Sequence, residues 1–166
     1  MEAFASVPVV GALSFRNAVL LYPLVTAAHV LEEWRGFPRW AQRFASPRYS
    51  RREYVITHAA ALVIATVSAL LARTFPTSWC ALLFFGLAFG PSIACNALFH
   101  IGSSLMTRAY CPGIITSVTL YLPATITVGA AALREGLLHP STLIAAMTFA
   151  AVFHLLEVGH NVFKRW

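Results

Sequence analysis

Five apolar segments of helix length, separated by short polar stretches, are the feature that most constrains this fold. Each segment is too long and too continuous for a β-strand, whereas a helix needs about 20 apolar residues to cross a bilayer core. Only 11% of the residues are charged, compared with about 25% in soluble domains. The sequence therefore predicts an all-α polytopic membrane helix bundle, a single domain over residues 1–166. The expected transmembrane spans are about 17–33, 54–72, 79–106, 114–133 and 141–163.

The basic residues predict the orientation of this bundle. They cluster in loops and do not follow helix faces, so the net charge of +6 does not indicate nucleic acid. Alternation of five spans places nine of the twelve Lys and Arg residues on one membrane face, which the positive-inside rule makes cytoplasmic. The N-terminus is then outside and the C-terminus inside. The nine are Arg35, Arg39, Arg43, Arg48, Arg51, Arg52, Arg108, Lys164 and Arg165, and the other three are Arg16, Arg73 and Arg134.

Three local features refine this prediction. Segment 34–53 mixes arginines with aromatic residues, so we expect a short interfacial helix or an ordered loop over the site at the headgroup level. Gly90-Pro91 predicts a kink within the third span. The first residues lack the basic start of a cleaved signal peptide, so the N-terminus is expected to be mature.

Ionisable side chains within the apolar segments are concentrated near the predicted cytoplasmic face. Three of the six carboxylates lie there, in a chain that has no Asp. An ionisable group in a span costs about 2.5–3.5 kcal/mol on insertion scales, so it persists where it pairs, binds an ion or reacts. Alternation brings histidines and glutamates of four helices to within roughly one to three turns of one boundary. The candidate metal ligands are His29, Glu32, Glu33, His58, His100, His154, Glu157 and His160.

The spacing and number of these residues favour two metal ions. His29 shares a helix face with glutamates three and four residues later, and Glu157-x-x-His160 has the spacing used in carboxylate-bridged di-iron bundles. Nitrogen and oxygen ligands without thiolate suit iron, zinc or manganese. Eight candidates exceed the four ligands of one tetrahedral zinc. We therefore expect two transition-metal ions about 3.5–4 Å apart, or one ion whose ligands are supported by the remaining residues, with iron favoured and zinc or manganese as alternatives.

Several of these residues also have a structural interpretation. His58 could equally be a core histidine with satisfied hydrogen bonds, and Glu33 could pair with loop arginines. Asn96 is expected to form hydrogen bonds and not to coordinate; together with Glu33 it is the candidate catalytic residue. His139, beside a proline, is expected in a loop on the opposite membrane face. The alternative for the whole set is a polar network that connects the helices.

The string His29-Val-Leu-Glu32-Glu33 resembles the signature of the HXXEE family, small bacterial integral membrane proteins named after this motif. The motif closes a first apolar span and is followed by histidine motifs in later spans, so the resemblance extends over most of the chain. It implies that His29, Glu32 and Glu33 are signature positions and that the protein lies in a bacterial cytoplasmic membrane. The family is chiefly uncharacterised, so the resemblance implies no reaction.

The residues themselves lead to three functional hypotheses. The first is a membrane oxidoreductase with a di-iron centre that oxidises a small or lipid-like substrate with O2, as a homo-oligomer or with a separate electron donor. The second is a zinc hydrolase in which a free glutamate acts as the general base. The third is a metal or proton transporter, which would need polar residues that continue to the opposite face. The outer halves of the spans contain no second ionisable cluster, so a one-sided site favours catalysis.

Overall fold

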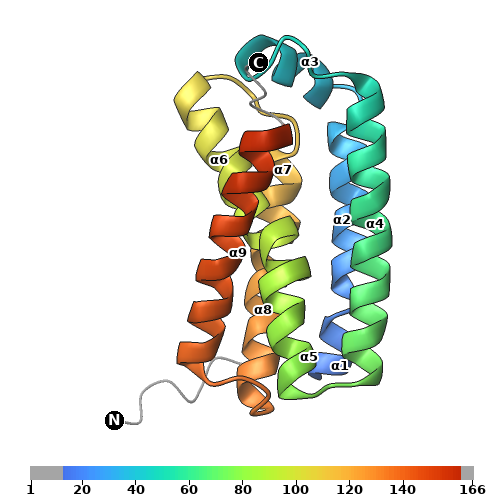
Figure 1. Cartoon of the computed structure of the whole chain (residues 1–166), viewed down its shortest axis with the longest axis vertical. Coiled ribbons are helices and arrows are strands. Elements are labelled where there is room, and N and C mark those ends of the chain that lie inside the picture. Colours follow the sequence, from blue (N-terminus) through green and yellow to red (C-terminus); the bar gives the residue numbers. More distant parts are fainter. Residues whose placement is uncertain (1–12, 162–166) are drawn as a thin grey trace.

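The computed structural model describes residues 13–161, which form an all-helical bundle of rods lying side by side (Figure 1). Four of these helical rods are long and apolar enough to cross a membrane. They agree with the last four predicted spans to within a few residues, as far as the described residues extend. They are Arg51–Thr74, Ser78–Thr107, Ile114–Arg134 and Pro140–His160.

The first predicted span is divided in two. Helix α1 (Phe15–Ala18) and helix α2 (Leu21–Glu33) are separated by a turn, so neither reaches the length of a span by itself. Both pack against α4 (Arg51–Thr74), and the three run alongside one another in Figure 1. Five spans and their orientation stay predictions. The two chain ends on which the orientation partly rests lie outside the described residues.

The kink expected at Gly90-Pro91 lies in a segment of π-helix, η1 (Phe84–Cys95), between α5 (Ser78–Leu83) and α6 (Asn96–Thr107). Proline removes one backbone donor, and wider turns of this kind accommodate such a break. Gly90 lets η1 approach α9 (Pro140–Asn161) closely, because a Cβ atom here would lie 2.8 Å from the Ala150 Cβ. This close contact packs η1 directly against α9.

Packing of aromatic rings forms the core at the end of the bundle away from the histidines. Phe15 and Tyr22 are fully buried against Phe84, and Tyr22 also packs edge-on against Phe89. The Tyr22 hydroxyl donates to the backbone carbonyl of Ala88 in η1. The π-helical turns of η1 are wider than those of an α-helix. This layer positions α2 against η1, so the polar ends of both helices meet at the other end of the bundle. The remaining helices are α7 (Ile114–Thr116), η2 (Ser117–Tyr121) and α8 (Leu122–Arg134).

Helix α3 (Phe37–Phe44) lies across the end of the bundle that carries the polar residues (Figure 1). It buries Phe37 and Trp40 and leaves Arg39 and Arg43 exposed. The segment expected as either an interfacial helix or an ordered loop over the site thus contains a short amphipathic helix, and that helix covers the site.

Candidate metal centre

The Glu33 carboxylate, at the end of α2, lies at the centre of three histidines from three helices. The Nε2 atoms are 2.8 Å (His58), 3.1 Å (His100) and 3.6 Å (His29) from its oxygens. Glu33, His29 and His100 are each 1% exposed, so no bulk water solvates the carboxylate. A buried carboxylate without a cationic or hydrogen-bonding partner is strongly unfavourable, so this group of four needs a proton or a metal ion between its members.

The partners of His58 show why a proton or a metal ion is needed between this ring and Glu33. Its Nδ1 lies 2.7 Å from the Tyr54 carbonyl oxygen, which can only accept, so Nδ1 carries a hydrogen. In a neutral ring Nε2 then has a lone pair, and it faces Glu33 Oε2. Although the two atoms are 2.8 Å apart, their arrangement is not that of a hydrogen bond, and Oε2 has no hydrogen-bond donor. Two acceptors at this distance require a proton on one of them or a metal ion between them.

His29 and His100 are oriented in the same way. The Thr116 hydroxyl donates to Glu32 at 2.5 Å, so it accepts from His29 Nδ1 at 2.8 Å. His100 Nδ1 lies 3.3 Å from the Cys111 Sγ, which also lies 3.9 Å from the Pro112 carbonyl oxygen. Each of the three rings therefore has an outer partner at Nδ1 and turns Nε2 to Glu33. Metal-binding histidines have this arrangement, in which the outer partner fixes the tautomer and the ring plane.

Aromatic rings hold the imidazoles in place. Tyr121 stacks on His29 with centroids 4.3 Å apart, and Tyr54 stacks on His58 at 3.9 Å. Phe37 of α3 packs edge-on against His100 at 5.8 Å and closes the group from the end of the bundle. These ring contacts restrict the orientations that the imidazoles can adopt.

Glu32, the other carboxylate of the motif, lies outside this group. Its oxygens accept from the backbone N–H groups of Gly113, Ile115 and Thr116 at 2.7–3.1 Å, from the Thr116 hydroxyl, and from the Tyr110 hydroxyl at 2.7 Å. A carboxylate at this point satisfies the free N–H groups at the start of α7. Glu32, predicted as a metal ligand, therefore caps a helix, and through Thr116 it orients His29.

The turn before α7 forms one wall of the group around Glu33, although no sequence pattern predicted it there. Gly113 has φ +101° and packs against His29 and His100, so a Cβ atom here would lie 2.7 Å from each ring. Burial raises the pKa of the Cys111 thiol to about 12, which keeps it protonated as a partner for His100. The Cys111-Pro112-Gly113 sequence is a recognisable turn signal, but nothing in it points to histidines far away in the chain.

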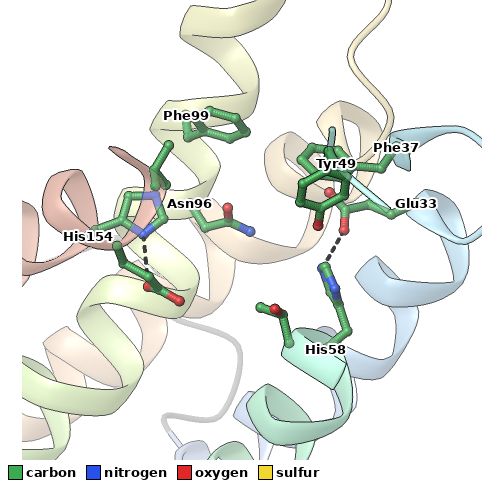
Figure 2. A pocket seen from close by; sticks show the side chains of 10 residues that line it. Glu33, Phe37, Tyr49, His58, Asn96, Phe99 and His154 are labelled. Atoms are coloured by element: carbon green, nitrogen blue, oxygen red, sulfur yellow. Dashed lines mark ion pairs between the residues drawn. The ribbon is translucent and has the colours of Figure 1, made fainter. Parts of the chain in front are cut away.

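A small cavity separates Glu33 and His58 from a second polar pair on α9 (Figure 2). Its volume is about 80 Å³, and a neighbouring cavity of about 100 Å³ has His58, Asn96, His154 and Glu157 in common with it. His154 is 7% exposed and neither of its ring nitrogens has a hydrogen-bond partner. Its Nδ1 is 3.9 Å from a Glu157 oxygen. These two side chains are thus placed to bind a group inside the cavity.

Of the eight predicted ligands, His29, Glu33, His58 and His100 lie together, His154 and Glu157 lie across the cavity, and Glu32 and His160 lie outside the group. His58, which had two interpretations, contacts Glu33 directly. Asn96 lines both cavities, and its amide nitrogen lies 3.1 Å from His29 Nε2, so it occupies the lone pair that a metal would use. His160 is exposed on the last turn of α9, outside the group formed by His29, Glu33 and His100. His139 is exposed before α9, at the opposite end of the bundle.

Three of these residues could hold a metal ion: His29, Glu33 and His100 each offer one ligand atom, and these atoms lie within 4.8 Å of one another. In a tetrahedral site with bonds of about 2.0–2.1 Å, neighbouring ligand atoms are about 3.3 Å apart. The distances of 3.1 Å (His100) and 3.6 Å (His29) to Glu33 Oε1 are close to this value, whereas His58 contacts the other carboxylate oxygen, Oε2. Imidazole and carboxylate ligands suit zinc, iron or manganese. To bind at His29, the ion would have to displace the Asn96 amide. His154 and Glu157 offer a nitrogen and an oxygen across the cavity.

Comparison with known proteins gives a family and no function. Neither the curated proteins nor the solved structures contain a match to this chain. The family described as "Protein of unknown function with HXXEE motif" matches residues 20–128, which include His29, Glu32 and Glu33, the positions of the motif. The matched region is about two thirds of the chain and contains two of the four helices that could cross a membrane, together with most of a third, Ile114–Arg134. The chain therefore belongs to the HXXEE family.

Proposed function

We propose that this protein is an integral-membrane metalloenzyme that uses iron and O2 to oxidise its substrate. The observation that carries the proposal is the convergence of three imidazole Nε2 atoms on one buried carboxylate, with each Nδ1 already engaged. In this proposal His29, Glu33, His58 and His100 hold one ion. His154 and Glu157 hold a second ion across the cavity, and Glu33 faces both positions.

The reaction needs the cavity as well as the ligands. With iron bound, one oxygen atom of O2 would enter a substrate C–H bond and the other would leave as water, with two electrons from a separate donor and two protons from the solvent. The chain itself supplies the surroundings. Phe37, Phe99 and Tyr49 line the cavity, and their rings would limit the access of bulk water to a reactive species. Asn96, which can rotate away from His29, would bind the substrate or the oxygen in the cavity.

A zinc hydrolase is the second candidate, and a specific observation favours it. His29, Glu33 and His100 could supply the three protein ligands of a catalytic zinc ion and leave its fourth position for water, whereas Glu157 lies across the cavity with its side chain 41% exposed. A carboxylate in that position could serve as a general base for a metal-bound water. In this alternative one zinc ion would suffice, and His154 would orient the base.

Metal analysis of purified protein tests the proposal. We expect two iron ions per chain in the wild type, one in His154→Ala, and at most one in Glu33→Gln, because Glu33 contacts every ligand of the first ion. His139→Ala is the matched control, since this histidine is exposed at the other end of the bundle and should leave the metal content unchanged. A wild-type protein that binds no metal would overturn the proposal.

Oxygen consumption distinguishes the two candidates. The ferrous protein should consume O2 and develop a ferric absorption band, and Glu33→Gln should do neither. One zinc ion per chain, with no response of the iron-loaded protein to oxygen, would support the hydrolase.

A further inference from the structure

An apolar groove of about 320 Å³ lies between α9 and the helix formed by η1 and α6, next to the polar cavity. Cys95 and Leu98 line one side, and Ala151 and Leu155 line the other. Apart from His154, every residue that lines the groove is apolar or a cysteine. The volume lies at the lower end of the about 300–1,000 Å³ of ligand pockets.

The groove and the polar cavity have three residues in common. Phe99, His154 and Val158 line both, and the rings of Phe99 and His154 pack edge to face with centroids 6.3 Å apart. His154 therefore forms a wall between the apolar groove and the cavity that contains Glu33. Because both nitrogens of its ring are without partners, this wall is the one place where the groove offers a polar contact.

The surroundings of the groove are hydrocarbon. Both helices that form it are long and apolar enough to cross a membrane, and Leu98 and Leu155 are 64% and 70% exposed on its rims. Residues 151–158 of α9 line the groove. At a rise of 1.5 Å per residue, they give it a length of about 10 Å. A molecule that enters sideways from the bilayer core meets these leucines first and His154 last.

We propose that the substrate is a lipid whose hydrocarbon chain lies in this groove, so that part of the chain passes His154 and reaches the cavity. The inference rests on the proposed function, and it names the substrate class for that same site. An apolar lining open to the bilayer at one end and a polar centre at the other match an alkyl chain, which needs no hydrogen bonds along its length. A small polar molecule from the aqueous phase would gain nothing from this lining.

Photo-crosslinking tests the assignment. The full-length, metal-loaded protein in phosphatidylcholine vesicles is incubated with a C16 fatty acid that carries a diazirine in mid-chain, irradiated and mapped by mass spectrometry. We expect adducts at Leu98 and Leu155 that excess unlabelled fatty acid removes, whereas adducts at Ile126, exposed on α8, persist as bilayer background. Equal labelling at all three positions, or no competition, would overturn the proposal.

Two substitutions on α9 provide the matched comparison. Ala151→Phe should fill the groove and reduce competed labelling about tenfold, equivalent to about 1.4 kcal/mol of binding free energy. Ala145→Phe adds the same ring at an exposed position on another face of α9 and should leave labelling unchanged. Equal labelling in both variants would also overturn the proposal, as would crosslinks at Leu98 to a second copy of the chain in place of lipid.

Metal content, measured on the same samples, separates this inference from the proposed function. Competed labelling in a protein that binds no metal would support the groove and refute the metalloenzyme. Normal metal loading without competed labelling would refute the lipid substrate alone. Ala151→Phe should keep the wild-type metal content, because the added ring lies in the groove and not among the ligands.

Discussion

At the scale of single residues, two adjacent glutamates have different tasks because of helix geometry. Successive residues of an α-helix are about 100° apart, so Glu33 faces His29 one turn earlier while Glu32 faces the start of α7. The spacing of the motif thus places His29 and Glu33 together on one face of α2 and leaves Glu32 to cap α7.

Glu32→Gln should destabilise the protein by about 1–3 kcal/mol, because the amide cannot replace a carboxylate that accepts from five donors. Thermal unfolding in detergent measures this loss. The folded fraction should keep most of its metal, whereas Glu33→Gln should lose metal. Equal metal loss in both variants would show that Glu32 is itself a ligand.

Gly113→Ala should reduce metal affinity by about 10–100-fold, the effect of losing an outer partner of a metal ligand. The new Cβ would displace both His29 and His100. Gly136→Ala is the control, because Gly136 also has a positive φ (+66°) but no atom within 4 Å of an added Cβ. If the two variants bind metal equally well, the contact with the rings is unimportant.

The hydrogen bond from Tyr110 to Glu32 should persist to high pH. Partial burial and this bond raise the pKa of Tyr110 from 10.0 to about 12. Because the folded pKa is the higher one, the stabilising contribution is complete below pH 10 and disappears as the pH rises through about 12. The difference in absorbance at 295 nm between wild type and Tyr110→Phe should appear near pH 12. A difference already complete near pH 10 would contradict the contact.

At the scale of the helices, the contact between η1 and α9 decides where the polar pair on α9 is placed. Gly90→Ala should destabilise the bundle by about 1–3 kcal/mol, because the added methyl would overlap Ala150 and the Phe85 carbonyl. Gly102→Ala in α6 has open space around it and should be neutral or stabilising by up to about 1 kcal/mol. Circular dichroism during heating compares the two. A Gly90→Ala protein as stable as Gly102→Ala would mean that the helices do not approach closely.

At the scale of the whole molecule, the orientation in the membrane decides which compartment supplies the metal. The predicted cytoplasmic face contains Arg48, and the opposite face contains His139. In a variant whose three cysteines are replaced by serine, Arg48→Cys should react with a membrane-impermeant maleimide only after the cells are opened. His139→Cys should react from outside in intact spheroplasts. The reverse pattern would place the metal centre on the outer face.

The sequence by itself determined the class of fold and the end of the bundle where the site lies. The length and apolarity of the segments allow no other arrangement in lipid, since every backbone polar group must be paired within its own helix. The positions of His29, Glu33, His58 and His100 along their segments then place them at one depth. These conclusions need only the rise of a helix and the alternation of spans.

The tertiary structure alone decided which of these residues meet. Depth along a helix follows from sequence position, but rotation about the helix axis is set by packing against neighbours. The rotation of α2 turns Glu33 to the histidines and Glu32 to α7, and the exposed face at the end of α9 leaves His160 outside the group. Thr116 and Gly113 contact His29 from more than 80 positions away in the chain. No local pattern marks such partners, because their role exists only when the packed helices bring them within hydrogen-bond or van der Waals distance.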